Sequence, residues 1–342
     1  PSGHAGFHLL PDGVDALSAR LSLAARAQRS IDLQYYLIKN DPVGRALIHV
    51  LLQAADRGVR VRLLLDDVFT AGYDAGLGAL DSHPNFEIRI FNPFNRGFAG
   101  RSIGAATNVS RVNRRMHNKS FTVDNQITII GGRNIADEYF GAREDAKFGD
   151  LDVLAIGPLV SDVSVMFDSY WNHETALPLP AFSKRLKDPG AGLDRLRGAL
   201  RASLEGAGTS RYAEAVRQDP VFTQLAAGSR AFSWAPYSLV YDSPDKGVRA
   251  RSRDAELIVT SLRAALLAAQ NEILLISPYF VPRKAGITSL SEIAGRGVGV
   301  TVITNSLAAN NQFTVHSGYA PARKPLLRAG VYWPGAGVTD LE

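Results

Sequence analysis

A junction between a helix and a strand occurs twice in this chain and limits the folds that the chain can adopt. The first junction, Arg57-Gly58-Val59, leads from a helical stretch into the apolar segment 61–65. The second, Arg296-Gly297-Val298, leads into the largely apolar segment 300–303, and its arginine lies 239 residues after the first. Strands of this kind are typical of parallel sheets that are covered by helices, because neither face of the sheet meets water.

The elements before each junction repeat as well. A helical pattern precedes a strand pattern in both halves, at residues 16–27 and 30–36 and again at residues 255–269 and 271–279. Two such series at nearly the same offset indicate an internal duplication. The sequence therefore predicts an α/β protein of two βαβ halves, each with a mostly parallel sheet flanked by helices.

Composition gives the expected domain boundaries. The 342 residues, 46% of them hydrophobic, suffice for about two domains with a substantial core. A Pro-Leu-Pro segment followed by basic amphipathic stretches separates the two halves. We therefore expect a first half at residues 1–177, a helical connector at 178–230 and an incomplete second half at 231–342.

Charge and cysteine content limit the partners and the chemistry. The net charge of +5 favours anionic partners, namely phosphates, anionic lipid surfaces or nucleic acid. The absence of cysteine excludes disulfides and thiolate chemistry, and it fits an exported protein somewhat better than a cytosolic one. No apolar run approaches the roughly 18 residues of a membrane-spanning helix. Because the chain begins with Pro1 rather than methionine, we expect that an initiator or a longer leader has been removed.

One β-rich segment carries the candidate chemistry. His117 and Lys119 lie two residues apart, so their side chains share one face of a strand. If the chain turns through a two-residue loop at 125–126, Asn134 lies opposite His117 and Gly132 lies opposite Lys119. The sequence therefore predicts that an imidazole, an ammonium and a carboxamide converge on one patch, with a glycine that lets a substrate approach closely.

These groups suit chemistry at phosphorus. An imidazole acts as a nucleophile or an acid–base group near neutral pH, and an amine and an amide stabilise phosphate oxygens as charge develops on them. The motif has no carboxylate cluster of the kind that Mg²⁺ or Ca²⁺ requires, so we expect neither a metal nor another cofactor. The alternative is a half-buried histidine in a basic hairpin that binds no ligand, and the length of the whole pattern argues against it.

The whole pattern resembles the HKD signature of the phospholipase D superfamily, in a variant with two glycines. The matching residues are His117, Lys119, Asp124, Gly131, Gly132 and Asn134. Further segments are similar to the bacterial cardiolipin synthases of the C type, at residues 66–67, 89–94, 114–116, 133–140, 150–153, 241–246 and 316–321. The resemblance covers nearly the whole chain and implies a fold of two phospholipase D-like halves.

The resemblance also implies roles for individual residues. In the superfamily two HKD motifs meet, one histidine forms a phosphohistidine and the other protonates the leaving alcohol. His117 is then the catalytic histidine of the first half, and Lys119 and Asn134 hold the phosphate, close to Gly132. Asp150 would orient the His117 ring, with a salt bridge at a strand end as the alternative. Asp124 is part of the motif, and its expected task at the bend is a turn cap or a buried pair.

The second motif that the resemblance implies is absent from these residues. No second H-x-K-x₄-D pattern occurs, and the repeat spacing would place its histidine near residue 356, beyond Glu342. His316 has glycine rather than lysine two residues later, so we expect it to line the substrate cleft rather than to react. We therefore expect a chain truncated before its second site, with a homodimer that completes the site as the alternative.

The expected function is phosphodiester chemistry on membrane glycerophospholipids, by a phospholipase or a phosphatidyltransferase at the surface of a bacterial membrane. Its partner would be an anionic phospholipid or membrane surface. Two roles stay open for a set of apolar residues near the expected cleft, namely ordinary core packing, which is favoured, and contact with acyl chains. These residues are Phe91, Phe94, Phe98, Tyr279 and Phe280. The alternatives are a nuclease of the same superfamily, which the lack of interleaved aromatic and basic residues disfavours, and a remnant that binds phosphate or membrane without catalysis.

Overall fold

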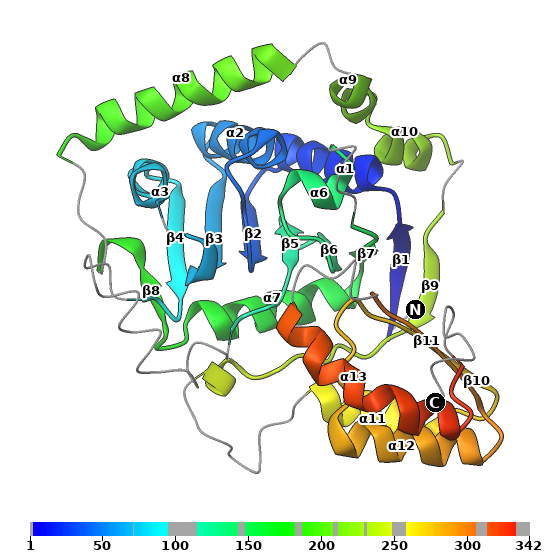
Figure 1. The fold of residues 1–342 in the computed structure, drawn as a ribbon. Coiled ribbons are helices and arrows are strands. Elements are labelled where there is room, and N and C mark those ends of the chain that lie inside the picture. Colours follow the sequence, from blue (N-terminus) through cyan, green and yellow to red (C-terminus); the bar gives the residue numbers. More distant parts are fainter. Residues whose placement is uncertain are drawn as a thin grey trace. The chain divides into compact units, whose positions relative to one another are not determined.

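The protein is an α/β protein, as the sequence predicts, and its chain forms two compact units, residues 1–255 and 256–342. The computed structural model describes residues 3–70, 72–94, 115–142, 148–181, 187–207, 211–228, 231–247, 258–305 and 313–332. Figure 1 shows the elements along the chain.

The first unit is built on a nine-stranded sheet of order β8-β4-β3-β2-β5-β6-β7-β1-β9. Its strands are β1 (His4–Leu10), β2 (Ser30–Tyr35), β3 (Arg60–Asp66), β4 (Phe86–Phe91), β5 (Ser120–Val123), β6 (Ile127–Gly131), β7 (Asp152–Ile156), β8 (Ala176–Pro178) and β9 (Ser233–Pro236). The expected parallel pairing is found for β2–β3 and β3–β4, which helices connect. The other neighbours in this sheet pair antiparallel.

Helices cover both faces of this sheet (Figure 1). The helices of the first unit are α1 (Gly13–Arg26), α2 (Pro42–Asp56), α3 (Asp74–Asp81), α6 (Asp137–Phe140), α7 (Pro158–Trp171), α8 (Pro189–Ala207), α9 (Arg211–Arg217) and α10 (Pro220–Ala226), with the short 3₁₀ turns η1 (Asp67–Phe69), η2 (Leu179–Ala181) and η3 (Pro244–Gly247). Ile31 and Leu33 of β2 belong to the core that includes α1 and α2. Phe167 of α7 belongs to a second core with Leu64 of β3.

The turn between β5 and β6 corrects one expectation. Val123 pairs with Ile127, so residues 124–126 form a three-residue turn, and the expected two-residue loop at 125–126 is wrong. Asp124 and Asn125 both take left-handed backbone angles, with φ of 53° and 55°, which residues of these types tolerate. The ladder of the two strands begins at Ser120, so the predicted cross-strand pairing of His117 with Asn134 and of Lys119 with Gly132 is also wrong.

The second unit repeats the junction of the first. It contains α11 (Ile258–Ala268), β10 (Glu272–Ile276), α12 (Arg283–Gly295), β11 (Gly299–Ile303) and α13 (Phe313–Arg328). β10 and β11 are parallel, as are β2 and β3. Gly58 and Gly297 end the two corresponding helices with φ of 94° and 87°, a conformation that glycine adopts without strain. The same backbone geometry at both junctions supports the internal duplication.

Residues 178–230 contain α8, α9 and α10, which pack on the first unit. α8 packs against α2 and α3, and α10 packs against α1. β9 follows this segment and pairs with β1, so the first unit extends to residue 255 and includes the beginning of the range 231–342.

Candidate active site

The HKD segment lies at one edge of the sheet. The parallel strands β2 and β3 end at Tyr35 and Asp66, and the antiparallel strand β5 begins at Ser120. Residues 117–119 therefore lie at the carboxyl ends of β2 and β3. Sites of α/β proteins form at this edge, because the loops that leave parallel strands converge there.

His117 and Lys119 are in direct contact. The Nζ atom of Lys119 lies 3.1 Å from Nδ1 of His117 and donates a hydrogen bond to the His117 backbone carbonyl at 2.7 Å. The ring of Tyr36, which follows β2, packs on the imidazole with 4.7 Å between ring centroids. His117 is exposed, whereas Lys119 is only 8% exposed. An imidazole at the surface thus stands over a buried ammonium, at a spacing that a single phosphoryl group can bridge.

Burial changes the acidity of Lys119. Desolvation lowers its pKa to about 8, although Asp150 and Asp152 act to raise it. The group is therefore mostly protonated at neutral pH and loses its charge in mildly alkaline solution.

Asn134 lies in the segment after β6 and is almost fully buried. Its Nδ2 atom donates to the Tyr139 hydroxyl at 3.0 Å, and its Oδ1 atom has no hydrogen-bond partner within the described part of the chain. An unsatisfied buried amide oxygen costs about 1–3 kcal/mol. If the amide turns over, the Tyr139 hydroxyl donates to Oδ1, and Nδ2 is available to a phosphate oxygen.

The two glycines after β6 make room for carboxylates. A Cβ atom on Gly132 would lie 1.7 Å from Oδ1 of Asp150, and one on Gly131 would lie 2.1 Å from Oδ1 of Asp152. Burial, followed by the charge of Asp152, raises the pKa of Asp150. Asp150 therefore lies against the end of β6, close enough to influence Lys119. Its hydrogen bond to His117 stays a prediction.

Asp152 begins β7 beneath the site, and sequence reasoning gave it no role. It is fully buried, and its Oδ2 atom lies 2.8 Å from Arg20 and 3.4 Å from Arg133. Arg20 also donates to the Tyr35 hydroxyl at 3.0 Å. The sequence did hold one signal for this ion pair. Arg20 lies in the apolar stripe of helix 13–26, and a buried guanidinium needs a counter-charge.

Asp66 at the end of β3 is a second residue whose role was missed. Its carboxylate accepts the backbone N–H groups of Met116 and Val68, both at 3.0 Å, and lies 3.5 Å from Arg115. Burial raises the pKa of Asp66 to about 7, against the opposing effect of Arg115 and these N–H groups. Asp66 thereby fixes the backbone of the residue that precedes His117.

Asp124 lies at the opposite end of β5 from the reacting groups. Its carboxylate accepts the backbone N–H groups of Gln28, Arg29 and Ser30 at 2.7–2.9 Å. Partial burial acts to raise the pKa of Asp124, but these N–H groups outweigh it and hold the pKa below its usual value. These contacts connect the β5–β6 turn to the start of β2.

The remaining sequence candidates belong to other elements of the two units or lie outside the described residues. His316 is on α13 of the second unit, and its side chain lies outside the described residues. Phe91 is buried in the core under α7, and Phe94 packs on Arg115. Phe98 lies outside the described residues. Tyr279 and Phe280 belong to the second unit.

The described residues hold no cluster of three His, Asp or Glu side chains that is suited to a metal ion. Among the helices that the structure describes, none has the length and apolarity needed to cross a bilayer.

Comparison with known proteins identifies the family. Residues 21–171, which include His117, Lys119, Asp124, Asn134 and Asp150, match the family described as cardiolipin synthase, PLD-like domain. Cardiolipin synthase C of Escherichia coli (strain K12) is 44% identical over 330 residues, which are 96% of this chain and 68% of that protein. The chain belongs to the cardiolipin synthase family. The expected resemblance to the phospholipase D superfamily is thereby confirmed.

The chain is also similar to an uncharacterized protein and to a solved structure. An uncharacterized protein of Helicobacter pylori (strain ATCC 700392 / 26695) is 32% identical over 335 residues, 96% of this chain and 64% of that protein. The chain thus spans about two thirds of the length of these curated relatives. The crystal structure of phosphatidylserine synthase from Haemophilus influenzae Rd KW20 is 14% identical, covers 92% of this chain and 66% of its own, and has a TM-score of 0.60. That likeness concerns the fold.

Proposed function

We propose that this protein is a phosphatidyltransferase of the phospholipase D type that acts on glycerophospholipids through a phosphohistidine at His117. The observation that carries the proposal is the pairing of His117 with Lys119, 3.1 Å apart at the carboxyl edge of the sheet. Sequence identity of 44% to a cardiolipin synthase supports the lipid substrate.

The first step forms a bond between a ring nitrogen of His117 and phosphorus and breaks the bond from phosphorus to the leaving alcohol. Lys119 and the amide of Asn134 stabilise the non-bridging oxygens as they gain charge. In the second step an acceptor alcohol attacks phosphorus, the bond to nitrogen breaks, and the proton of the acceptor is removed by a base. The acceptor is a second lipid alcohol in transfer and water in hydrolysis.

The tautomer of His117 decides which nitrogen attacks. Lys119 lies next to Nδ1 and can donate only if Nδ1 carries no proton. A bound phosphate attracts the Lys119 ammonium away from Nδ1. Nδ1 can then carry the ring proton and donate a hydrogen bond to the Asp150 carboxylate, so that the unprotonated Nε2 attacks phosphorus. The donor of a proton to the leaving alcohol belongs, in the superfamily, to a second HKD motif that residues 1–342 do not contain.

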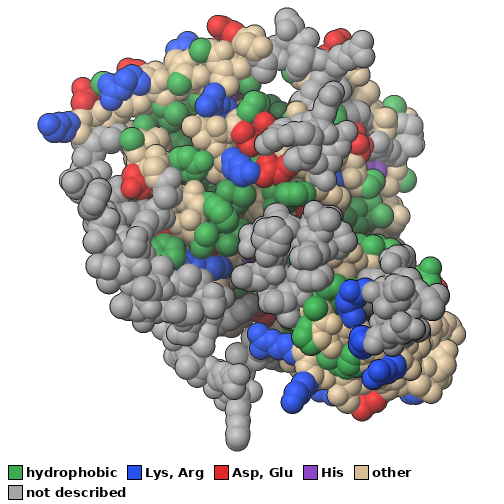
Figure 2. All heavy atoms as spheres, in the orientation of Figure 1, with side chains coloured by type: hydrophobic (Ala, Val, Ile, Leu, Met, Phe, Trp, Pro, Cys, Tyr) green, Lys and Arg blue, Asp and Glu red, His purple; other side chains and the backbone are tan. Residues whose placement is uncertain are grey.

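The partner we propose is an anionic phospholipid in a membrane surface, to which the protein binds peripherally. The net charge of +5 supports this assignment. Figure 2 shows Lys and Arg side chains along α8, above apolar side chains on the same face of the molecule. Basic groups beside apolar ones suit a surface of anionic headgroups and acyl chains.

A substrate with a leaving group that needs no proton tests the proposal. Phosphatidyl-p-nitrophenol releases a stable anion, so the first step proceeds without the second motif. We expect a burst of p-nitrophenolate equal to the amount of protein, together with an acid-labile phosphatidyl-protein, and expect neither in His117→Ala. His49→Ala, which changes a histidine on α2, is the matched control and should behave as the wild type.

Three outcomes contradict the proposal. The first is a burst that survives in His117→Ala, and the second is the absence of a phosphatidyl-protein in the wild type. The third is nicking of plasmid DNA in a parallel assay without any lipid product, which would assign the protein to the nucleases of its superfamily.

A further inference from the structure

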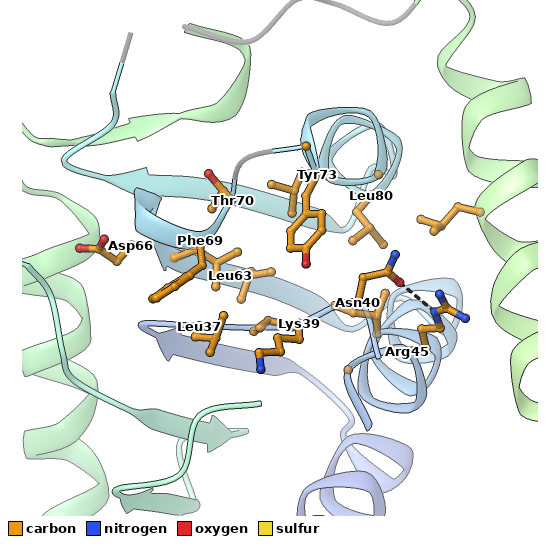
Figure 3. Close-up of a pocket in the computed structure, with 18 of the residues that line it drawn as sticks. Leu37, Lys39, Asn40, Arg45, Leu63, Asp66, Phe69, Thr70, Tyr73 and Leu80 are labelled. Atoms are coloured by element: carbon orange, nitrogen blue, oxygen red, sulfur yellow. Dashed lines mark hydrogen bonds between the residues drawn. The ribbon is translucent and has the colours of Figure 1, made fainter. Parts of the chain in front are cut away.

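An apolar cavity of about 200 Å³ lies beside the candidate active site, between the ends of β2 and β3 and the helices α2, α3 and α8. Figure 3 shows the side chains that converge on it. Most of its inner wall is aliphatic: Leu63 and Leu65 of β3, Leu77 and Leu80 of α3, and Leu196 and Leu200 of α8. A wall of this kind binds hydrocarbon, because it offers dispersion contacts and removes apolar surface from water.

Tyr36 connects this cavity to the catalytic histidine. It lines the cavity, and its ring packs on His117 with 4.7 Å between centroids. Phe69 packs edge-on against the Tyr36 ring, with 5.3 Å between ring centroids, and also lines the cavity. A phosphate bound at His117 is therefore one aromatic ring away from the cavity, so two parts of a single ligand can occupy both.

The charged groups that line the cavity are held by partners. Lys39 forms an ion pair with Glu138, and Arg45 donates to the Asn40 amide oxygen at 2.8 Å (Figure 3). Asp66 accepts backbone N–H groups outside the cavity, from Met116 and Val68. The side chains that face an occupant are thus mostly aliphatic or aromatic, which favours a hydrocarbon over a sugar or a base.

We propose that this cavity binds one fatty acyl chain of the phospholipid whose phosphate lies at His117. The proposal rests on the function proposed above and adds a site that selects the substrate by acyl length. A glycerophospholipid carries its phosphate and its acyl chains on one glycerol, which matches the adjacency of His117 and the cavity. Each methylene that becomes fully buried raises affinity about fourfold, until the cavity is full.

Gly76 provides a way to fill the cavity without damage to the fold. It lies on α3 and lines the cavity, and a Cβ atom built on it meets nothing within 4 Å. Gly76→Leu therefore occupies part of the volume that an acyl chain would use. Gly198→Leu is the matched control, because Gly198 is also a helical glycine with open space around its Cβ position, on α8, and it does not line the cavity.

Binding measured by calorimetry tests the proposal on the full chain. The ligands are lysophosphatidylglycerols with acyl chains of about six to twelve carbons, below their micelle concentrations, and glycerophosphoglycerol as the ligand without a chain. We expect wild-type affinity to rise up to about fourfold per methylene and then to level off. In Gly76→Leu the affinity should level off at a shorter chain, and Gly198→Leu should match the wild type.

The proposal is overturned if wild-type affinity does not depend on chain length, or if Gly76→Leu keeps the wild-type dependence. If the proposed function is wrong but the acyl site is right, the two experiments give a different combination of results. The p-nitrophenolate burst is then absent, while the dependence on chain length and its sensitivity to Gly76→Leu remain. Conversely, a normal burst with binding that is insensitive to Gly76→Leu removes only the acyl site.

Discussion

Replacement of Asp152 by asparagine removes a charge that two buried guanidinium groups share. Asp152 is fully buried, and Arg20 and Arg133 are 1% and 2% exposed. The substitution keeps the shape of the side chain and leaves two cations facing a neutral amide. Removal of one partner from a buried ion pair costs about 3–5 kcal/mol, because the remaining charge is neither solvated nor paired.

The contacts that survive place the expected loss at the lower end of this range. Arg133 keeps the backbone carbonyls of Leu10, Pro11 and Tyr139, at 2.6–3.0 Å. Arg20 keeps the carbonyl of Ala16 and the Tyr35 hydroxyl. We therefore expect the free energy of unfolding to fall by about 3 kcal/mol. For a unit of this size the melting temperature falls about 2–4 °C per kcal/mol, so the expected decrease is roughly 6–12 °C.

Urea and thermal unfolding, followed by circular dichroism, measure this loss. The control is Asp168→Asn, because Asp168 is half exposed and its partner Arg62 keeps both oxygens of Asp32. That variant should lose less than about 1 kcal/mol. A loss below about 1 kcal/mol in Asp152→Asn, or equal losses in the two variants, would refute the argument.

Three further variants test the site. Because burial lowers the pKa of Lys119 to about 8, the burst rate should fall as pH rises through that value, and Lys119→Arg should move the fall to higher pH. Gly132→Ala should displace the Asp150 carboxylate, which acts to raise the pKa of Lys119, and so move the fall to lower pH. Asp124→Asn should cost about 1 kcal/mol at neutral pH, because the carboxylate accepts three backbone N–H groups but is partly solvated. The pKa of Asp124 is lowered on folding, so this cost is present above the unfolded pKa near 3.8 and disappears as pH falls through the lower folded value.

Each of these results has a clear contrary outcome. A pH profile that Lys119→Arg leaves unchanged would assign the alkaline fall to another group. A Gly132→Ala variant with the wild-type profile would mean that Asp150 does not influence Lys119. For Asp124→Asn, the free energy of unfolding is measured against pH. A loss of stability that persists in acid would mean that the charge of Asp124 does not stabilise these contacts.

The sequence predicted the parts of the fold that local patterns determine. The repeated Arg-Gly-Val junction predicted the parallel pairs β2–β3 and β10–β11, because a glycine at positive φ followed by an apolar run ends a helix and begins a buried strand. The spacing of His117 and Lys119 predicted that their side chains meet, and they do. The expected strand was wrong at these two residues, because β5 begins only at Ser120. The hairpin register was wrong by one residue, because the sequence does not reveal that Asp124 and Asn125 both take left-handed angles.

The contacts that support the site could not be predicted in this way. Arg20 and Asp152 are 132 residues apart, and Asp66 and Met116 are 50 apart. The first pair joins α1 to the start of β7, and the second joins the end of β3 to the segment before β5, so both depend on how the sheet and its helices are assembled. Periodicity within a window of the chain carries no information on such pairs. The acyl cavity was missed for the same reason, since its walls come from β3, α3 and α8.

The hydrogen bonds that Asp124 accepts from the start of β2 also affect how this chain folds during synthesis. The three amides that it binds leave the ribosome 94 to 96 residues before it. Before Asp124 and β5 are synthesised, the backbone N–H and C=O groups along one edge of β2 have no hydrogen-bond partner in the sheet. The centre of the sheet therefore stays open. A nascent chain that stalls before residue 124 thus exposes one unpaired edge of β2, a feature of the intermediates that chaperones protect from aggregation.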